Sequence, residues 1–163
     1  MDKETFGTMI LDNKDSLYRV AKSILKDDED CADAIGEAVA KGFEKLHRLK
    51  KDEYAKTWLI RILINECYNI HRRWQRFEPQ NELLDSFEEG SCVNGSETEY
   101  PMLHAAIDQL EDKQRLIIDL YYIEEYSTNE IAKLMGMSVN NVKVNLSRAR
   151  KKIKNYLEEC VDG

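Results

Sequence analysis

The chain has few of the residues that interrupt helices or cross-link a fold. Its 163 residues include only two prolines and seven glycines, which leaves room for long helices. The four cysteines form no C-x-x-C pair, and their spacing fits neither zinc ligation nor a disulfide framework. They stand at Cys31, Cys67, Cys92 and Cys160. We therefore expect reduced thiols, as in a cytoplasmic protein.

Long hydrophobic runs and histidine clusters are also missing. No apolar run approaches the roughly 18 residues that a membrane-spanning helix needs. The opening segment, MDKETFGTMI, is acidic and lacks the plan of a signal peptide. The histidines are scattered, so neither a metal site nor another cofactor is expected. We expect a cytoplasmic protein without membrane insertion.

No alternation of apolar and polar residues predicts a strand, and the expected fold is all-α. Apolar spacing predicts helices over residues 2–26, 31–48, 57–76, 102–110 and 112–124, followed by a helix-turn-helix. The segment from 77 to 100 contains Pro79, Gly90 and Gly95, lacks helical periodicity, and reads as a flexible acidic linker. The sequence thus predicts two small helical domains, 1–76 and 101–163, joined by the linker 77–100.

Two predictions concern packing in the first domain. In the second helix, the inward positions are expected to be Ile35, Val39, Phe43 and Leu46. The first half of the helix over 57–76 is apolar nearly all round, so it is expected at the centre of a bundle.

Charge is unevenly distributed along the chain, whose net charge is −7. Residues 41–76 carry ten bases and four acids, and residues 138–163 carry six bases and three acids. Residues 78–100 carry seven acids and no base. Two separate basic patches indicate two contacts with one long polyanion. The overall negative charge weakens DNA binding by the free protein, so binding is expected to depend on a partner.

The segment after residue 126 is typical of a helix-turn-helix. Ser127 and Glu130 form an S-x-x-E capping box at the start of a short helix, and Gly136 can end that helix in the left-handed conformation. Ser138 can then cap a second, longer helix. The apolar positions of this helix recur at intervals of three and four and are Val139, Val142, Leu146, Ala149 and Ile153. The pairing of two capped helices through a glycine turn favours DNA binding over an ordinary solvated basic face.

The remaining surface of the longer helix that Ser138 caps is polar near its start and basic later. Such a helix suits the major groove, where residues near the N-terminus reach base edges and later cations meet phosphates. The predicted DNA-binding residues here are Asn140, Asn141, Lys143, Val144, Asn145, Ser147, Arg148 and Lys151.

The helix over 57–76 carries a second candidate nucleic-acid surface. Its polar positions are spaced four, four, three and four residues apart and share one face. Cations interleaved with amides and rings suit unpaired bases, although Trp58 fits a core position better than a stacking position. The predicted binding residues are Arg61, Asn65, Tyr68, Asn69, Arg72, Arg73 and Arg76.

Asp33 and Glu37, four residues apart, share one face of the helix predicted over residues 31–48. No histidine, serine or glycine-rich loop accompanies them, so the pair does not indicate acid–base catalysis. An exposed acidic face is either solvated or a docking surface for a basic partner.

The chain resembles bacterial RNA polymerase sigma factors of the extracytoplasmic-function group over about residues 6–157. The matching segments are LYRVAKSILKDDEDCADAIGEAVAKGF, TWLIRILINECYNIHRR and AIDQLEDKQRLIIDLYYIEEYSTNEIAKLMGMSVNNVKVNLSRARKKI, in the order of that family. The family differs at Gly36 and Val39, where it usually has glutamine and an aromatic, and at Asn145, where it commonly has arginine.

The resemblance implies a subunit that directs promoter-specific transcription and is not an enzyme. The expected partners are core RNA polymerase, promoter DNA and an anti-sigma factor. Asp33 and Glu37 would bind polymerase, the helix over 57–76 and the loop Leu49–Tyr54 would take the melted minus-ten element, and helix 138–157 would read the minus-thirty-five element. The alternatives are a stand-alone helix-turn-helix regulator and an adaptor whose basic faces meet acidic proteins.

Overall fold

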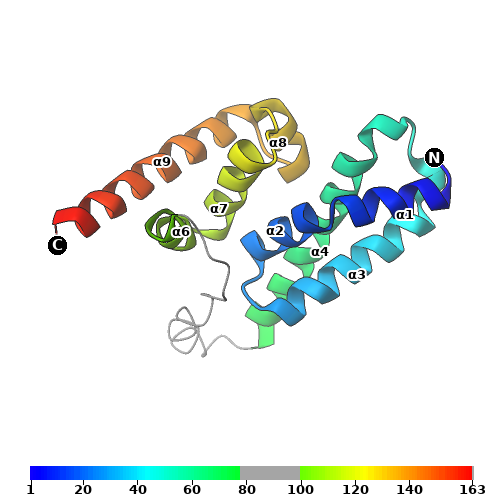
Figure 1. The fold of residues 1–163 in the computed structure, drawn as a ribbon, viewed down its shortest axis with the longest axis horizontal. Coiled ribbons are helices and arrows are strands. Elements are labelled where there is room, and N and C mark those ends of the chain that lie inside the picture. The colour runs from blue at the N-terminus through cyan, green and yellow to red at the C-terminus, as the bar shows by residue number, and fades with distance from the viewer. Residues whose placement is uncertain (78–99, 163) are drawn as a thin grey trace.

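The computed structural model describes residues 1–77 and 100–162, and every regular element in these ranges is a helix (Figure 1). The first domain consists of α1 (Lys3–Asp12), α2 (Lys14–Ile24), α3 (Asp28–Glu44) and α4 (Ala55–Phe77). The second consists of α6 (Pro101–Asp108), α7 (Asp112–Ile118), α8 (Thr128–Met135) and α9 (Val139–Asp162). Short 3-10 helices span Leu46–Arg48 and Asp52–Tyr54, and a π-helix spans Asp119–Ile123. The predicted all-α fold with two helical domains is confirmed, whereas residues 78–99 of the predicted linker lie outside the described residues.

The single helix predicted over residues 2–26 is wrong, because the chain breaks at Asn13. The side-chain amide of Asn13 donates to the carbonyl of Met9 at 2.8 Å, and its backbone N–H reaches the same carbonyl. Asparagine competes for backbone hydrogen bonds in this way and ends helices. Two other predicted helices also end early: α3 stops at Glu44, and α7 passes into the π-helix after Ile118.

The α4 helix lies at the centre of the first domain, as its apolar sequence predicted. Its first half buries Leu59, Ile60, Leu63 and Ile64, and it packs against α2 and α3. The buried stripe of α3 differs from the prediction, because small side chains face the core: Cys31, Ala34, Ala38 and Gly42. Of the four predicted inward residues, Leu46 is buried as predicted. Ile35, Val39 and Phe43 are only partly buried. Small side chains let two helix backbones approach closely, and at Gly42 an added Cβ would lie 2.9 Å from the ring of Phe6.

The helix-turn-helix of the second domain forms as its sequence predicted. Both hydrogen bonds of the capping box are present between Ser127 and Glu130 at the start of α8. Gly136 ends α8 with φ of 64°, in the left-handed region that glycine adopts without strain. Ser138 then accepts from the backbone N–H of Asn141 at 3.0 Å and caps α9. The inner stripe of α9 is buried at Val142, Leu146 and Ala149.

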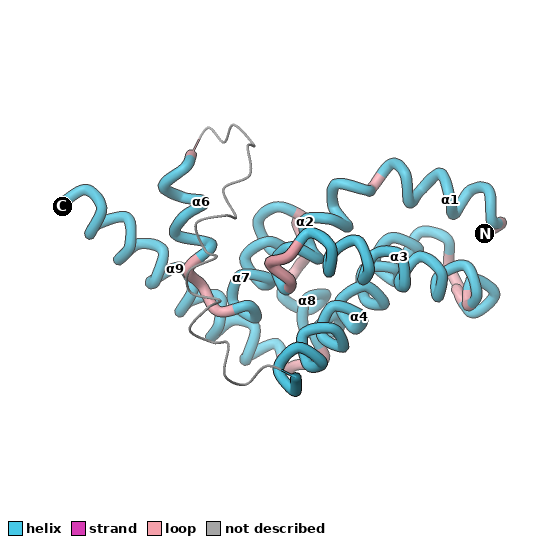
Figure 2. Tube along the Cα trace, turned by 90° about the horizontal axis from the view of Figure 1, so that it is seen from below, coloured by secondary structure: helices cyan, strands magenta, loops and turns pink. Residues whose placement is uncertain are grey.

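The two domains pack against each other: α2 and α4 of the first contact α7, α8 and the π-helix of the second. In Figures 1 and 2, α2 lies beside α7, and α2 also contacts the π-helix. The α4 helix contacts α8, which in turn contacts α9. Buried apolar side chains of both domains form one connected cluster. The two candidate nucleic-acid helices, α4 and α9, therefore lie on either side of α8, which contacts both.

Candidate nucleic-acid interface

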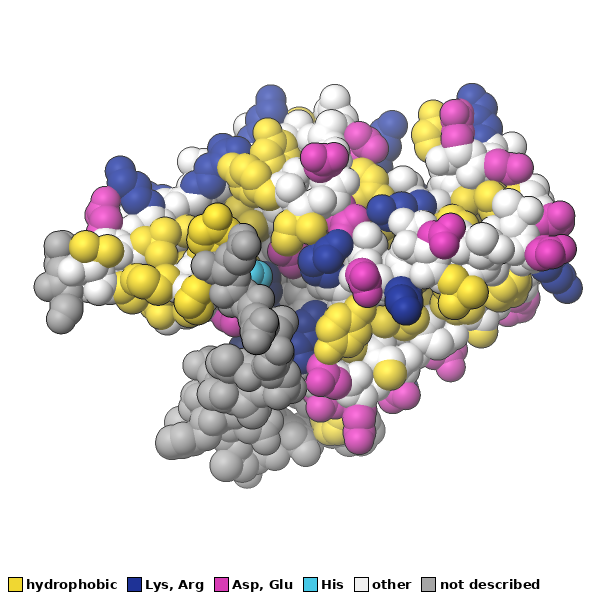
Figure 3. All heavy atoms as spheres, in the orientation of Figure 1, with side chains coloured by type: hydrophobic (Ala, Val, Ile, Leu, Met, Phe, Trp, Pro, Cys, Tyr) yellow, Lys and Arg dark blue, Asp and Glu magenta, His cyan; other side chains and the backbone are white. Residues whose placement is uncertain are grey.

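The outer face of α9 carries a polar and basic surface. Most of the predicted residues are exposed: Asn140, Asn141, Lys143, Ser147, Arg148 and Lys151. Val144 and Asn145 are half-buried. Figure 3 shows Lys and Arg side chains along the outer edge of α9. The six Lys and Arg residues of this helix precede its first acid, Glu158, so its exposed N-terminal two thirds are positive.

The half-buried position of Asn145 has a specific cause. Its side-chain nitrogen donates to the backbone carbonyl of Asn141 at 2.8 Å and to the side-chain oxygen of Asn141 at 3.0 Å. Asn145 and Arg148 also line a groove between α9 and the start of α7, opposite Glu111 and Gln114. The structure therefore brings Asn141 and Asn145 together as a pair of amides near the start of α9.

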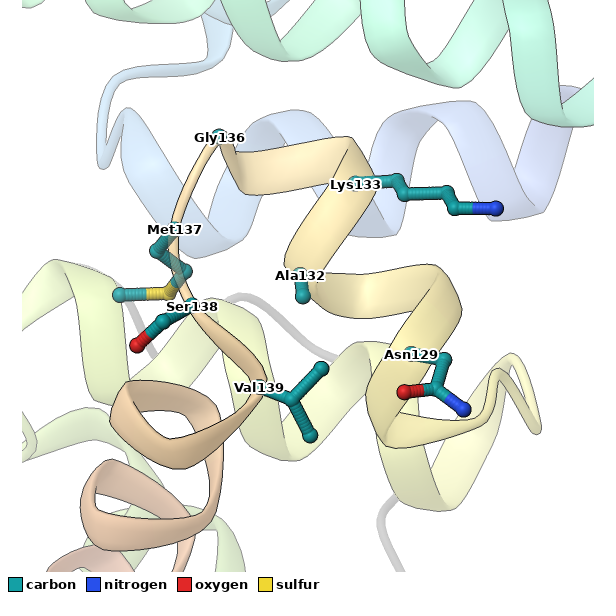
Figure 4. Close-up of a pocket in the computed structure, with 7 residues that line it drawn as sticks. All are labelled: Asn129, Ala132, Lys133, Gly136, Met137, Ser138 and Val139. Carbon is teal, nitrogen blue, oxygen red and sulfur yellow. The ribbon is translucent and has the colours of Figure 1, made fainter.

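A shallow hollow lies between α8 and the start of α9 (Figure 4). Asn129 and Lys133 line it from α8, and Val139 lines it from α9. Figure 4 shows Lys133 extending away from the turn at Gly136, and both polar side chains are exposed. Sequence reasoning did not select Asn129 and Lys133. The signal for them was their place on the exposed face of the first helix of a helix-turn-helix, the element that crosses the DNA backbone in such motifs.

Two basic side chains of α9 are engaged with the protein itself. Arg150 donates to the hydroxyl of Tyr122 at 2.6 Å and lies 5.6 Å from the ring centre of Tyr121. Lys152 donates to the side-chain oxygen of Gln114 at 3.0 Å. These two cations help fix α9 against α7 and the π-helix, and they differ in this from the exposed Arg148 and Lys151.

The polar stripe of α4 is exposed along one face of the helix. Arg61, Asn65, Asn69 and Arg72 are exposed, as is Arg73 beside them. Arg72 donates to the side-chain oxygen of Asn69 at 2.6 Å, which orders the two side chains side by side. The side chain of Arg76 lies outside the described residues. The described part of the stripe therefore presents cations and amides together, the combination that suits a single strand.

The aromatic residues near this stripe have different environments. Trp58 is partly buried, with its ring centre 6.0 Å from that of Phe6, so it belongs to the core. Trp74 is 47% exposed and Tyr54, in the preceding loop, is 55% exposed. Tyr68 is half-buried, and burial together with the nearby charge of Asp112 raises its pKa to about 12. Trp74 and Tyr54 are thus accessible rings, whereas Tyr68 is partly covered by the second domain.

The third surface is acidic and lies on α3. Asp33 and Glu37 are exposed on one face, and among the described residues neither forms an ion pair. Gly36 lies between them, with open space where a Cβ would stand. Figure 3 shows Asp and Glu side chains along the outer edge of α3. This side of the first domain is free to meet a basic or polar partner.

Two family models match the two domains. Residues 9–77 match "Sigma-70 region 2", and residues 101–153 match "Sigma-70, region 4". The chain belongs to the sigma-70 family of sigma factors. This membership confirms the resemblance seen in the sequence, and it does not favour a stand-alone helix-turn-helix regulator, because the first domain matches region 2 over nearly its whole length.

Named relatives are similar in sequence over almost the full length of the chain. The sigma factor SigV of Bacillus subtilis is 29% identical over 91% of this chain and 89% of its own length. The RNA polymerase sigma-E factor of Streptomyces antibioticus is 28% identical over 94% of this chain and 84% of its own length. Among solved structures, the sigma factor RpoE of Bartonella quintana, in complex with the anti-sigma factor NepR, is 24% identical with a TM-score of 0.74. That similarity covers 95% of this chain and 98% of RpoE.

Other kinds of site are missing from the described ranges. Within residues 1–77 and 100–162, no group of three or more His, Cys, Asp or Glu side chains is placed to bind a metal ion. No helix in the same ranges has both the length and the apolar character needed to cross a bilayer. Cys31, Cys67 and Cys160 are free thiols, the first two buried.

Proposed function

We propose that this sigma factor binds core RNA polymerase and reads a promoter through two separate helices, α4 and α9. This proposal rests on two exposed faces that are rich in cations and amides, one on α4 in the first domain and one on α9 in the second. An extended polyanion such as DNA can be held at both faces at once. We assign the minus-ten contact to residues 1–76, as region 2, and the minus-thirty-five contact to residues 101–163, as region 4. Residues 77–100 connect the two domains.

The α9 helix is proposed to enter the major groove of the minus-thirty-five element with its N-terminus first. Asn140, Asn141, Lys143 and Asn145 then lie nearest the bases, since the first turns of a recognition helix reach base edges. Arg148 and Lys151 follow along the helix and meet phosphates, and so position the helix without reading sequence. Lys133 of α8 is placed to add a further phosphate contact beside the turn.

The α4 helix is proposed to hold the melted strand of the minus-ten element. Arg61, Arg72 and Arg73 supply charge for its phosphates, while Asn65 and Asn69 supply hydrogen bonds between them. The exposed rings of Tyr54 and Trp74 are available for base stacking at the two ends of this surface. Opening of the duplex is thus stabilised by capture of one strand, and no catalytic group is required.

The acidic face of α3 is proposed to dock on polymerase through Asp33 and Glu37. Both carboxylates are exposed and unpaired among the described residues, so they can be desolvated against cationic groups of a partner with little loss of existing contacts. An anti-sigma factor is a further proposed partner, because the RpoE structure of this fold is a complex with the anti-sigma factor NepR. The proposed compartment is the cytoplasm, where polymerase is found.

In vitro transcription with purified core polymerase tests this function most simply. The chain is added to core polymerase on a promoter library randomised at both elements, and the transcripts are sequenced. We expect transcripts only in the presence of the chain, all from templates that share two short motifs about 25 base pairs apart, a spacing of about 85 Å in B-DNA. Core polymerase alone is the control. Equal transcription with and without the chain would contradict the proposal.

A further inference from the structure

Arg150, an exposed residue of α9, is held by two tyrosines of the π-helix. Its side-chain Nε donates to the hydroxyl of Tyr122 at 2.6 Å. Its guanidinium carbon lies 5.6 Å from the ring centre of Tyr121 and 5.5 Å from that of Tyr122. The two rings meet edge to face, with their centres 4.9 Å apart. One cation is thus fixed by a hydrogen bond and by two ring contacts, a geometry that suits the planar guanidinium of arginine.

The segment that carries the two rings is itself well packed. Asp119 and Leu120, at the start of the π-helix, are buried. The backbone N–H of Glu124 donates to the carbonyl of Asp119 at 3.0 Å and closes the wide turn. Turns of this kind are rare and occur mostly at functional sites. Arg150 is therefore attached to a packed part of the second domain.

A second polar contact holds α9 from its other side. The ammonium of Lys152 donates to the side-chain oxygen of Gln114 at 3.0 Å, and Gln114 is buried in α7. Arg150 directly follows Ala149, which is buried in the inner stripe of α9. Lys152 directly precedes Ile153, which packs on the core from the same stripe. Because side chains four residues apart share one face of a helix, the two cations flank this stripe on opposite sides.

These two contacts together fix the rotation of α9 about its own axis. The inner stripe is apolar, and the burial of apolar surface has no preferred direction. Hydrogen bonds are directional, and two of them on opposite flanks resist rotation in both senses. A rotation of about 20° would move the ends of side chains, about 5–6 Å from the helix axis, by about 2 Å. Such a displacement is enough to break a hydrogen bond to a base.

We propose that Arg150 is a positioning residue for promoter reading. Its contact with the two tyrosines sets the rotation of α9 and thereby decides which bases Asn141 and Asn145 reach. This inference rests on the proposed function, since it concerns how α9 reads the minus-thirty-five element. Arg150 acts through the orientation of the helix and touches no base or phosphate. In this it differs from Arg148 and Lys151, which are proposed to meet phosphates.

Residual dipolar couplings test the orientation of α9 directly in the free full-length chain. The couplings of backbone N–H groups vary periodically along a helix, and the phase of this variation reports the rotation of the helix about its axis. Arg150→Ala is compared with Lys154→Ala, which removes the same charge from another exposed position of α9. Relative to α7 and α8, we expect a phase shift of about 20° or more in Arg150→Ala and none in Lys154→Ala. The parental phase in Arg150→Ala, or an equal shift in Lys154→Ala, would overturn the proposal.

The second readout is base preference in the complex with core polymerase, measured by selection of active promoters from a randomised minus-thirty-five library. In Arg150→Ala, the preference for the parental base at the affected position should fall at least about fivefold, the lower bound for loss of a good base contact. The salt dependence of promoter binding should keep its parental slope, because Arg150 neutralises no phosphate. An unchanged motif, or a slope reduced by about 0.9 as for one lost phosphate contact, would overturn the positioning role.

Should Arg150→Ala lose its helical circular dichroism, Tyr122→Phe tests the same contact, because it removes only the hydroxyl that accepts from Arg150. The dipolar couplings need neither polymerase nor promoter. A chain whose α9 turns as expected but which directs no transcription therefore contradicts the proposed function and not the orientation that Arg150 imposes.

Discussion

Asn145 is held by Asn141, one turn earlier on α9, through hydrogen bonds of 2.8 Å and 3.0 Å from its side-chain nitrogen. This arrangement uses the donor of Asn145 and leaves its oxygen, together with the side-chain nitrogen of Asn141, available to a ligand. Adenine presents one donor and one acceptor at its major-groove edge. We therefore propose that Asn141 and Asn145 contact one adenine together, through the side-chain nitrogen of Asn141 and the side-chain oxygen of Asn145.

The first prediction is that Asn141→Ala and Asn145→Ala change the same base preference in the minus-thirty-five element. Loss of a good bidentate contact costs about 1–3 kcal/mol of discrimination. Lys151→Ala, the control for a phosphate contact, should weaken all sequences alike and lower the salt dependence. Active promoters are selected from a randomised minus-thirty-five library with each variant. If Asn145→Ala leaves the selected motif unchanged while Lys151→Ala rewrites it, the docking orientation of α9 is wrong.

The second prediction concerns Asp33 and Glu37 on α3. Reversing both to lysine should sharply weaken capture of core polymerase, because their proposed contacts are with basic or polar groups. Both side chains are exposed, so the free energy of unfolding should change by less than about 0.5 kcal/mol. The matched control reverses Glu4 and Asp12 on α1, which changes net charge equally on another exposed surface. Pull-down of core polymerase at the parental level by the Asp33–Glu37 variant would refute the assignment.

The third prediction is that Arg72→Ala with Arg73→Ala impairs promoter melting more than polymerase binding. Arg72 and Asn69 are hydrogen-bonded side by side on the exposed stripe, so loss of Arg72 also releases Asn69. Permanganate reactivity of thymines in the minus-ten strand reports melting directly. Lys3→Ala with Lys14→Ala removes the same charge from α1 and α2, and this control should melt promoters normally. Parental reactivity in the Arg72–Arg73 variant would count against α4 as the strand-binding helix.

The fourth prediction is a pH dependence that arises from Asp119. Burial raises the pKa of this carboxyl to about 6, from an ordinary value of 3.8. A raised carboxyl pKa favours the folded chain fully below the ordinary pKa, and that contribution is lost as pH rises through about 6. Asp119→Asn, which stays uncharged, should therefore unfold at a higher temperature than the parent at pH 7.5. The gain is on the order of 1–3 kcal/mol and should shrink towards pH 4. Thermal unfolding of both chains across this range is the measurement, and a gain independent of pH would show that charge on Asp119 is not its cause.

The fifth prediction uses two glycines on α3. A Cβ at Gly42 would lie 2.9 Å from the Phe6 ring and 3.2 Å from Leu59, and both neighbours are fully buried. Gly42→Ala should lower the free energy of unfolding by about 1–3 kcal/mol, because a tightly packed core cannot accommodate an added methyl group without strain. Gly36→Ala meets no atom within 4 Å and should be neutral or stabilising by up to about 1 kcal/mol. Denaturant unfolding of the two variants distinguishes them, and equal stability would contradict the close approach of α3 to the core.

Local features of this fold could be predicted from the sequence because their causes are local. The capping box of Ser127 and Glu130 and the left-handed Gly136 depend on residues a few positions apart, and both occur as predicted. The break at Asn13 was missed, because asparagine is tolerated within helices and only its hydrogen bond to Met9 shows that it ends one. The buried stripe of α3 was misjudged, since large apolar residues were favoured over the small ones that permit close packing.

Contacts between distant segments could not be predicted in the same way. Glu124 is an ordinary acidic residue in a turn until the fold places Ser16, Arg19 and Lys56 around it. The partial covering of Tyr68 likewise depends on the position of Asp112 in the other domain. The sequence identified the candidate faces of α4 and α9 from their spacing and charge. How the two faces are held relative to each other follows only from the packing of α8 between their helices.

Photo-crosslinking in the polymerase–promoter complex tests the central claim most directly. A photoreactive amino acid replaces Asn140 on α9 in one variant and Asn65 on α4 in another, and the crosslinked bases are mapped. The account predicts crosslinks from position 140 to the minus-thirty-five element alone and from position 65 to the minus-ten strand alone, about 85 Å apart along the duplex. Crosslinks from both positions to one element, or from neither position to DNA, would contradict it.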